Sequence, residues 1–207
     1  MKVTWTEFNA GPVQLEALNV GSIDFGDVGE APPIFAQAAG APLVYAGATV
    51  PRPALEAVIV PSGSAIRSVA DLKGKRVAYN KGSNVHYFLV KLLEKHGLKY
   101  ADVQSVFLAP ADARAAFEKG AVDAWIIWDP FLASAQKMLG ARILADATGV
   151  VNNRAYSFSS RDFASRHPEA LPIAVSEINA LHPWAAKNKD AAAPPLSAVL
   201  VPDTDIT

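Results

Sequence analysis

The residues best able to do chemistry lie in one short stretch, Tyr79-Asn80-Lys81-Gly82-Ser83-Asn84-Val85-His86. An apolar run predicts a buried strand before it, and apolar residues at helical spacing predict a helix after it. With Ser83 or Asn84 as the N-cap, free backbone N–H groups and the positive end of the helix dipole would meet at this turn. Lys81 adds a full positive charge beside them. The stretch therefore predicts a binding corner for a phosphate, sulfate, sulfonate or carboxylate, with an ordinary capped turn as the alternative.

The same stretch offers a second kind of chemistry. Ser83 and His86 lie three positions apart, so their side chains can touch on the first turn of the helix. With Asp129 or Glu30 as the carboxylate, they would form the parts of a serine-type ester hydrolase. The Gly-x-Ser-x-Gly elbow of many hydrolases is absent here, because Ser83 is followed by Asn84 and Val85. Chance proximity is therefore favoured, and the hydrolase stays open as the alternative.

The composition excludes several classes of protein. The chain has 207 residues, of which 51% are apolar, and 19 Lys and Arg against 20 Asp and Glu give a net charge of -1. This balance argues against nucleic acid or an anionic membrane as a main partner. The absence of cysteine excludes disulfides, thiol nucleophiles and thiolate metal sites. The histidines show no metal-binding spacing, so neither a metal nor a cofactor is predicted. No signal peptide is recognised, since Met1 and Lys2 lead directly into an alternating segment.

Hydrophobic periodicity and turn residues predict strands alternating with helices, which indicates an α/β fold with mostly parallel sheets flanked by helices. Extended segments near residues 58–61 and 155–158 would join two such blocks. We therefore expect two lobes with a cleft between them, residues 1–60 plus 155–207 forming lobe 1 and residues 61–154 forming lobe 2. The predicted strands are 3–8, 23–26, 43–48, 56–60, 75–79, 103–108, 122–128, 142–144 and 156–159; the main predicted helices are 13–18, 34–39, 87–95, 110–118, 131–138 and 171–181, and residues 191–207 are expected to be a poorly specified tail.

Three predicted strands end in corners that would face the cleft, because ligands of open α/β sheets bind at the carboxyl ends of strands. These corners are Gly29-Glu30-Ala31, Lys81-Gly82-Ser83 and Trp128-Asp129. Glu30 could bind a cationic group or repel a wrong anion. Trp125 and Trp128 lie three apart on a strand and would point to opposite faces, so we expect Trp125 in the core and Trp128 in the cleft. Asp129 could contact the ligand or simply cap the next helix.

At these corners the sequence resembles the aliphatic sulfonate-binding proteins of bacterial ABC importers, which belong to the nitrate, taurine and sulfonate solute-binding family. The resemblance runs from about Val3 to about Phe163. It is carried by Gly21-Ser22-Ile23-Asp24-Phe25, Gly29-Glu30-Ala31-Pro32-Pro33, Val69-Ala70-Asp71-Leu72-Lys73-Gly74, Lys81-Gly82-Ser83, Pro110-Ala111-Asp112-Ala113-Arg114 and Trp125-Ile126-Ile127-Trp128-Asp129-Pro130.

The resemblance implies a type II periplasmic-binding fold that closes on a small organic sulfonate, such as an alkanesulfonate or taurine, and delivers it to an ABC permease in the membrane. It implies a periplasmic location and makes a binding protein more probable than an enzyme. The expected ligand-binding residues are Gly29, Glu30, Ala31, Lys81, Gly82, Ser83, Asn84, His86, Trp128 and Asp129.

The same resemblance implies that this chain is shorter than the family pattern. The family's first strand and helix would precede Met1, and further helices would follow Leu181. Two additional readings follow: a shortened chain without a function of its own, and a homodimer formed through surfaces that the other segments would cover.

Overall fold

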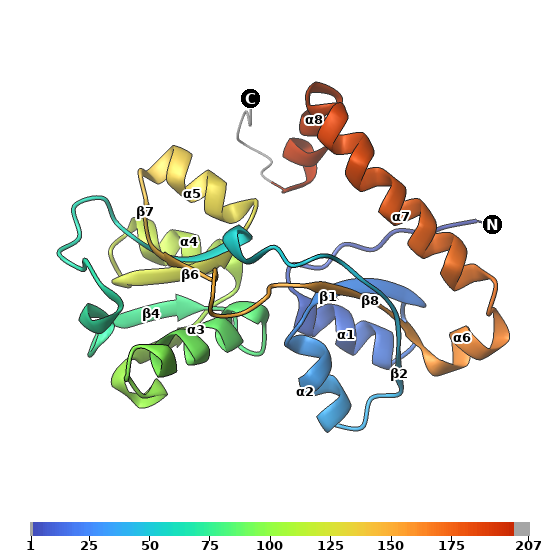
Figure 1. Cartoon of the computed structure of the whole chain (residues 1–207), viewed down its shortest axis with the longest axis horizontal. Coiled ribbons are helices and arrows are strands. Elements are labelled where there is room, and N and C mark those ends of the chain that lie inside the picture. Colours follow the sequence, from blue (N-terminus) through green and yellow to red (C-terminus); the bar gives the residue numbers. More distant parts are fainter. Residues whose placement is uncertain (1, 201–207) are drawn as a thin grey trace. The chain divides into compact units, whose positions relative to one another are not determined.

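The computed structural model describes residues 2–200, with the side chains of residue 182 and residues 195–200 left out of the description. Two compact units make up this part of the chain: one ends at Ser160 and the other begins at Arg161. The first contains both sheets (Figure 1). The second consists of the helices α6 (Arg161–Arg166), α7 (Ala170–Lys187) and α8 (Lys189–Leu200).

A three-stranded sheet is formed by residues from two distant parts of the chain. The strand β8 (Ala155–Ser160) lies in the middle and pairs antiparallel with both β1 (Phe25–Gly29) and β2 (Leu43–Ala48). The helices α1 (Gly11–Asn19) and α2 (Pro32–Ala38) pack on it. Leu15, Leu18 and Phe158 are buried in the small core between them. This core fixes the position of the corner that follows β1.

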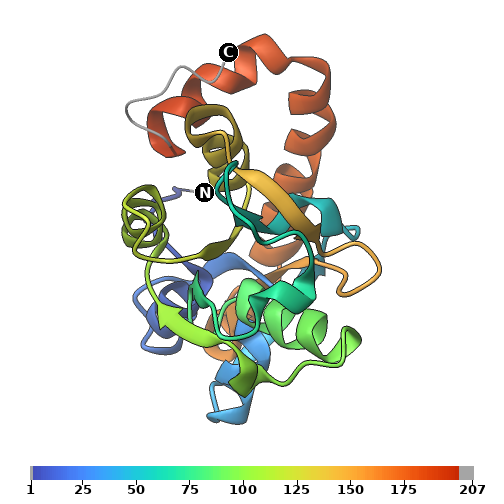
Figure 2. The same cartoon turned by 90° about the vertical axis from the view of Figure 1, so that its left-hand side faces the viewer.

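The second sheet has five strands in the order β5-β4-β6-β3-β7. The strands β4 (Arg76–Tyr79), β5 (Gln104–Phe107) and β6 (Ala124–Trp128) are parallel, whereas β3 (Glu56–Val60) runs antiparallel to both β6 and β7 (Arg142–Asp146). The helix α3 (Asn84–Lys95) covers one face, and α4 (Pro110–Glu118) and α5 (Phe131–Leu139) cover the other (Figure 2). Short 3-10 helices complete the unit: η1 (Pro53–Leu55), η2 (Val69–Leu72) and η3 (Tyr100–Asp102).

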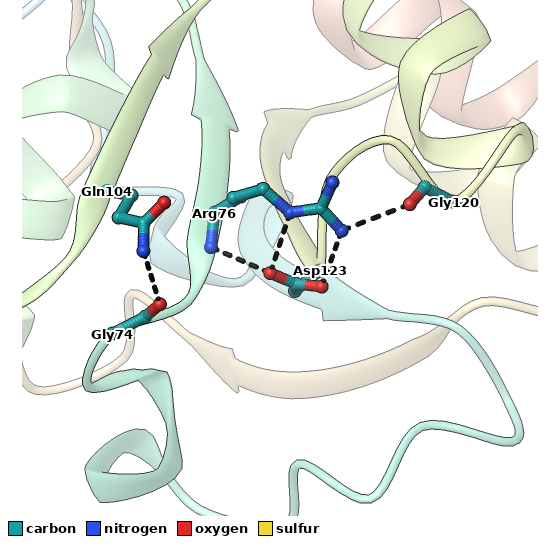
Figure 3. A network of polar contacts seen from close by, with 5 residues as sticks. All are labelled: Gly74, Arg76, Gln104, Gly120 and Asp123. Carbon is teal, nitrogen blue, oxygen red and sulfur yellow. Dashed lines mark hydrogen bonds and ion pairs between the residues drawn. The ribbon is translucent and has the colours of Figure 1, made fainter.

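An ion pair joins β4 to the segment that enters β6 (Figure 3). The guanidinium of Arg76 donates to both carboxylate oxygens of Asp123, at 2.9 and 3.2 Å, and to the carbonyl of Gly120 at 3.1 Å. The backbone N–H of Arg76 also donates to Asp123, at 2.8 Å. Beside it, the amide of Gln104 donates to the carbonyl of Gly74 at 2.9 Å. These contacts hold the edge of the sheet where the parallel strands begin.

Several predicted elements need correction. The alternating segment 3–8 forms neither helix nor strand, and Trp5 is 83% exposed, because alternation produces a strand only where a partner supplies a hydrogen-bonded ladder. The prediction of mostly parallel sheets is wrong. Both sheets contain antiparallel pairs, since β3 and β8 enter from the connecting segments and no crossover helix dictates their direction. Residues 191–200 of the expected tail lie in α8, and residues 201–207 lie outside the described part.

The lobe boundaries at residues 60 and 155 stay a prediction, but strand pairing constrains them. The strand β3 was expected to close lobe 1, and it pairs within the five-stranded sheet instead. The chain therefore crosses between the sheets before Glu56 and again between Asp146 and Ala155. These two crossing segments lie side by side, because the N–H of Arg52 donates to the carbonyls of Asn152 and Asn153.

Candidate functional site

The loop between β4 and α3 turns at Gly82, whose φ of +77° favours glycine. Its N–H donates to Nδ1 of His86 at 3.2 Å, so this group is already occupied. Ser83 stands at the N-cap position of α3, as expected, but its hydroxyl makes no cap bond and donates to the carbonyl of Asn80 at 2.7 Å. Ser83 is 3% exposed. The loop is thus held by its own side chains before any ligand binds.

These contacts also bear on the hydrolase alternative. A serine nucleophile needs its hydroxyl bonded to the base that takes its proton. Here the hydroxyl of Ser83 is committed to a backbone carbonyl, and Nδ1 of His86 accepts from a backbone N–H. Their spacing of three positions places the two residues on one helix turn without aligning them for proton transfer. The Ser83–His86 catalytic pair of the alternative hypothesis is not assembled, in agreement with the favoured interpretation of chance proximity.

Asn84 connects the loop to the corner after β1. Its Oδ1 accepts from the N–H of Ala31 at 3.3 Å, and its Nδ2 donates to Oδ1 of Asn153 at 3.1 Å. Gly29 makes room for this amide: a Cβ built on Gly29 would lie 1.9 Å from Nδ2 of Asn84. Two corners that are 53 residues apart in sequence therefore meet through one side chain, with a glycine required opposite it.

Asn153 is the centre of this arrangement and lies in the left-handed region, with φ +49°. Its N–H donates to Oε1 of Glu30 at 3.0 Å, and its side-chain amide donates to the carbonyl of Arg52 at 3.0 Å. Asparagine tolerates this backbone conformation better than most residues. We call Gly29, Glu30, Ala31, Asn84 and Asn153 the polar junction. It joins the two sheets and the crossing segments.

The third predicted corner reaches the same edge of the five-stranded sheet. β4 and β6 are parallel, with Ala78 opposite Trp125, so their carboxyl ends share one edge with the loop that begins α3. Antiparallel β3 begins there, with Glu56 opposite Trp128. Trp125 is 1% exposed and belongs to the core, as predicted, while Trp128 is half-buried.

Asp129, at the end of β6, caps the helix that follows. Its Oδ1 accepts from the N–H of Ala133 at 3.0 Å, which was the alternative to ligand contact. Burial raises the pKa of Asp129, and the hydrogen bond from Ala133 opposes this shift.

Glu56 is the most unusual group at this edge. It is completely buried, and neither carboxyl oxygen has a hydrogen-bond partner among the side chains and backbone groups that the structure describes. Burial, and secondly the charge of Glu30, raise the pKa of Glu56 to about 8. Glu30 itself faces the crossing segment, where it accepts from the N–H of Asn153 and, at 3.5 Å, from that of Arg154. The corner therefore holds two carboxyl groups, one partnered and one not.

His86 is surrounded by aromatic rings. Its ring centroid lies 5.2 Å from that of Tyr79, 5.6 Å from Tyr100, and 6.5 Å from Phe35, whose plane is inclined by only 12°. Burial, and secondly the charge of Lys81, lower the pKa of His86, so its ring is neutral at pH 7. Phe35 is 53% exposed. It also lines a groove of about 240 Å³ between α1 and α2 that reaches Gly82.

The arrangement suits recognition of an anion more than covalent chemistry. α3 begins beside the polar junction, and the N–H groups of its first two residues, Asn84 and Val85, have no acceptor among the described residues. Their dipoles and Lys81 favour negative charge there. Within the described residues, no group of three or more His, Asp or Glu side chains could hold a metal ion.

Sequence reasoning missed Glu56, Asn153 and Arg154. A weak signal existed for the first, because a charged residue opens the otherwise apolar strand Glu56-Ala57-Val58-Ile59-Val60. For Asn153 the signal was the Asn152-Asn153 pair, a residue type common at left-handed positions. Neither signal indicates that the residue lies beside Glu30.

Comparison with known proteins supports the expected resemblance. A model of the NMT1/THI5-like family matches residues 2–188. The chain belongs to the NMT1/THI5-like family.

Members of this family similar to the chain include a protein of Escherichia coli (strain K12) that is named for binding aliphatic sulfonates. It is 51% identical over 80% of this chain and 52% of its own length. A protein of Bacillus subtilis (strain 168) with the same name is 35% identical over 93% of this chain and 58% of its own length. The chain thus spans about half the length of these curated relatives.

A solved structure confirms the two-lobed α/β fold class of this family. The alkanesulfonate-binding protein SsuA from Xanthomonas axonopodis pv. citri, bound to MOPS, superposes with a TM-score of 0.91 at 45% identity, over 96% of this chain and 68% of that one. The resemblance to sulfonate-binding proteins is therefore confirmed, and the relatives are binding proteins rather than enzymes. None of the helices in the described part is long and apolar enough to cross a membrane.

Proposed function

We propose that this chain binds a small organic sulfonate where the three corners meet, as the solute-binding component of an ABC importer. The observation that carries the proposal is the polar junction, because it brings Gly29-Glu30-Ala31 against the loop that begins α3. The sulfonate would take the free N–H groups at the start of α3, with Lys81 nearby. The half-buried Trp128 and the exposed ring of Phe35 would offer apolar surface to the organic tail. The names of the relatives support this ligand class.

Delivery to a membrane permease and a periplasmic location belong to the same proposal and rest on the resemblance to the sulfonate-binding proteins of ABC importers. Deleting the gene should abolish growth on an alkanesulfonate as the sole sulfur source and leave growth on sulfate unchanged. Equal growth on both would contradict the transport role. Association of two copies through exposed apolar surface is a separate proposal, which light scattering at increasing protein concentration would test.

Titration calorimetry tests the binding claim directly. Ethanesulfonate, taurine and MOPS are the ligands, nitrate and sulfate are the competitors, and the buffer must contain no sulfonate. We expect one molecule of sulfonate to bind per chain. Gly29→Ala should weaken this binding at least tenfold, because its Cβ would displace the amide of Asn84. Gly63→Ala is the matched control, since Gly63 has open space around its Cβ position. A folded sample that gives no heat with any anion would leave a chain without binding activity of its own.

A further inference from the structure

Glu56 is the first residue of β3, which lies between β6 and β7 in the five-stranded sheet. Alternate residues of β3 point to opposite faces, and Val58 and Val60 pack in the cluster that contains Val85 of α3. Glu56 shares their face, so its carboxyl group lies on the side that α3 covers. Its strand partner Trp128 packs against the same cluster. The unpartnered carboxyl therefore lies at the sheet edge where the free N–H groups of α3 are found.

A buried carboxylate is costly without hydrogen bonds or a counter-ion, and among the described residues neither oxygen of Glu56 has a hydrogen-bond partner. Charged and titratable groups on the elements around it include Glu30 after β1, Asp129 after β6, Asp146 at the end of β7, Lys81 before α3, His86 in the first turn of α3, and Arg52 and Arg154 on the crossing segments. Among them, the negative charge of Glu30 is the one that shifts the pKa of Glu56, and it opposes ionisation. Protonation therefore removes the cost of burying a charge at this carboxyl group.

We infer that binding of the anion at the start of α3 is coupled to protonation of Glu56. The inference rests on the proposed function. An ionised Glu56 would add its negative charge to that of Glu30 next to the incoming sulfonate. At a pH where Glu56 is ionised in the ligand-free protein, binding would therefore proceed with one proton passing from solvent to its carboxylate, which becomes the neutral acid; at lower pH the carboxyl group already carries this proton. A proton taken up in this way remains on Glu56 while the anion is bound and returns to solvent when the anion leaves.

The pH range separates Glu56 from the other groups. A sulfonate stays ionised at all accessible pH values, and ethanesulfonate has no amine, so the ligand does not titrate. His86 changes charge only below its ordinary value, because its pKa is lowered. Between pH 7 and 9.5, Glu56 would titrate near 8. Replacing Glu56 would therefore show whether a change in sulfonate affinity across that range is caused by this residue.

Calorimetry with ethanesulfonate should be run from pH 7 to 9.5 in Tris and in borate, two sulfonate-free buffers with different heats of ionisation. The wild-type chain is expected to take up a fraction of a proton on binding that grows through pH 8. Its affinity should fall by a factor approaching ten per pH unit above that value. Glu56→Gln should bind within about twofold of wild type at pH 7, without proton uptake and without the fall. The matched control Glu177→Gln, an exposed glutamate, should keep the wild-type behaviour.

The outcomes distinguish the two proposals. Absence of sulfonate binding at every pH would overturn the proposed function and this inference with it. Binding with no proton uptake by the wild-type chain would overturn the inference alone, and this measurement needs no variant to fold. Proton uptake that persists in Glu56→Gln would overturn the assignment to Glu56.

Discussion

Two carboxyl groups, one near each end of β6, are in opposite situations. Asp123, just before the strand, accepts from the guanidinium and the backbone N–H of Arg76, and those hydrogen bonds lower the pKa of Asp123 (Figure 3). Glu56, opposite the last residue of the strand, has no hydrogen-bond partner among the described residues, and burial raises its pKa to about 8. The first end is built for stability. The second keeps an unsatisfied group beside the candidate site, which is typical of positions retained for function.

The largest expected effect comes from removing the unpartnered carboxyl. The folded chain holds the proton of Glu56 up to about pH 8, whereas the unfolded chain loses it near the ordinary value of 4.5. The contribution of Glu56 to stability is therefore full below about pH 4.5 and falls as the pH rises toward 8. At about 1.4 kcal/mol per pH unit, this difference is roughly 3–5 kcal/mol.

Thermal unfolding of the ligand-free protein at pH 5 and pH 9 would measure this loss of stability. Glu56→Gln should match wild type at pH 5 and unfold at least about 6 °C higher at pH 9. If the unfolding temperatures of wild type and Glu56→Gln changed with pH in parallel, Glu56 would not be the group that makes stability fall at high pH.

The partnered end should respond with the opposite sign. Asp123→Asn removes the charge that the guanidinium of Arg76 contacts, and we expect the unfolding temperature at pH 7 to drop by about 3–6 °C. Because the pKa of Asp123 is lowered, its contribution is present above the ordinary value and is lost as the pH falls below it. The gap between variant and wild type should thus narrow as the pH falls below 3.8 in circular dichroism melts. An unchanged melt at pH 7 would remove Asp123 from the stabilising contacts.

The smallest expected change in stability is that of an ion pair on the surface. Glu118 contacts Arg114 at 2.8 Å on the exposed side of α4, where solvent screens the attraction. Glu118→Gln should therefore change the free energy of unfolding by about 0.5 kcal/mol or less in urea titrations. A change in the free energy of unfolding well above about 1 kcal/mol would mean that this exposed carboxylate stabilises the fold as much as a more buried one such as Asp123.

Most individual elements could be predicted from sequence, since their signals are local. β2 and β3 have the predicted bounds, and α3 ends near Gly97 as its apolar spacing indicated. The predictions that failed concern features that depend on pairing between distant segments of the chain. Residues 3–8 alternate but pair with no strand, and strand direction in both sheets depended on where the chain crosses between them.

The features of the candidate site also fall into those that local sequence predicts and those that depend on tertiary packing. The sequence alone determined which turns carry free N–H groups and positive charge, because N-caps, glycines and lysines act over a few residues. Only the tertiary structure decided that Asn84 fills the space opposite Gly29, that Asn153 binds Glu30, and that Glu56 is buried without a hydrogen-bond partner in the part of the chain that the structure describes. Those facts depend on which distant segments pack together, and the burial that shifts a carboxyl pKa exists only once they have done so.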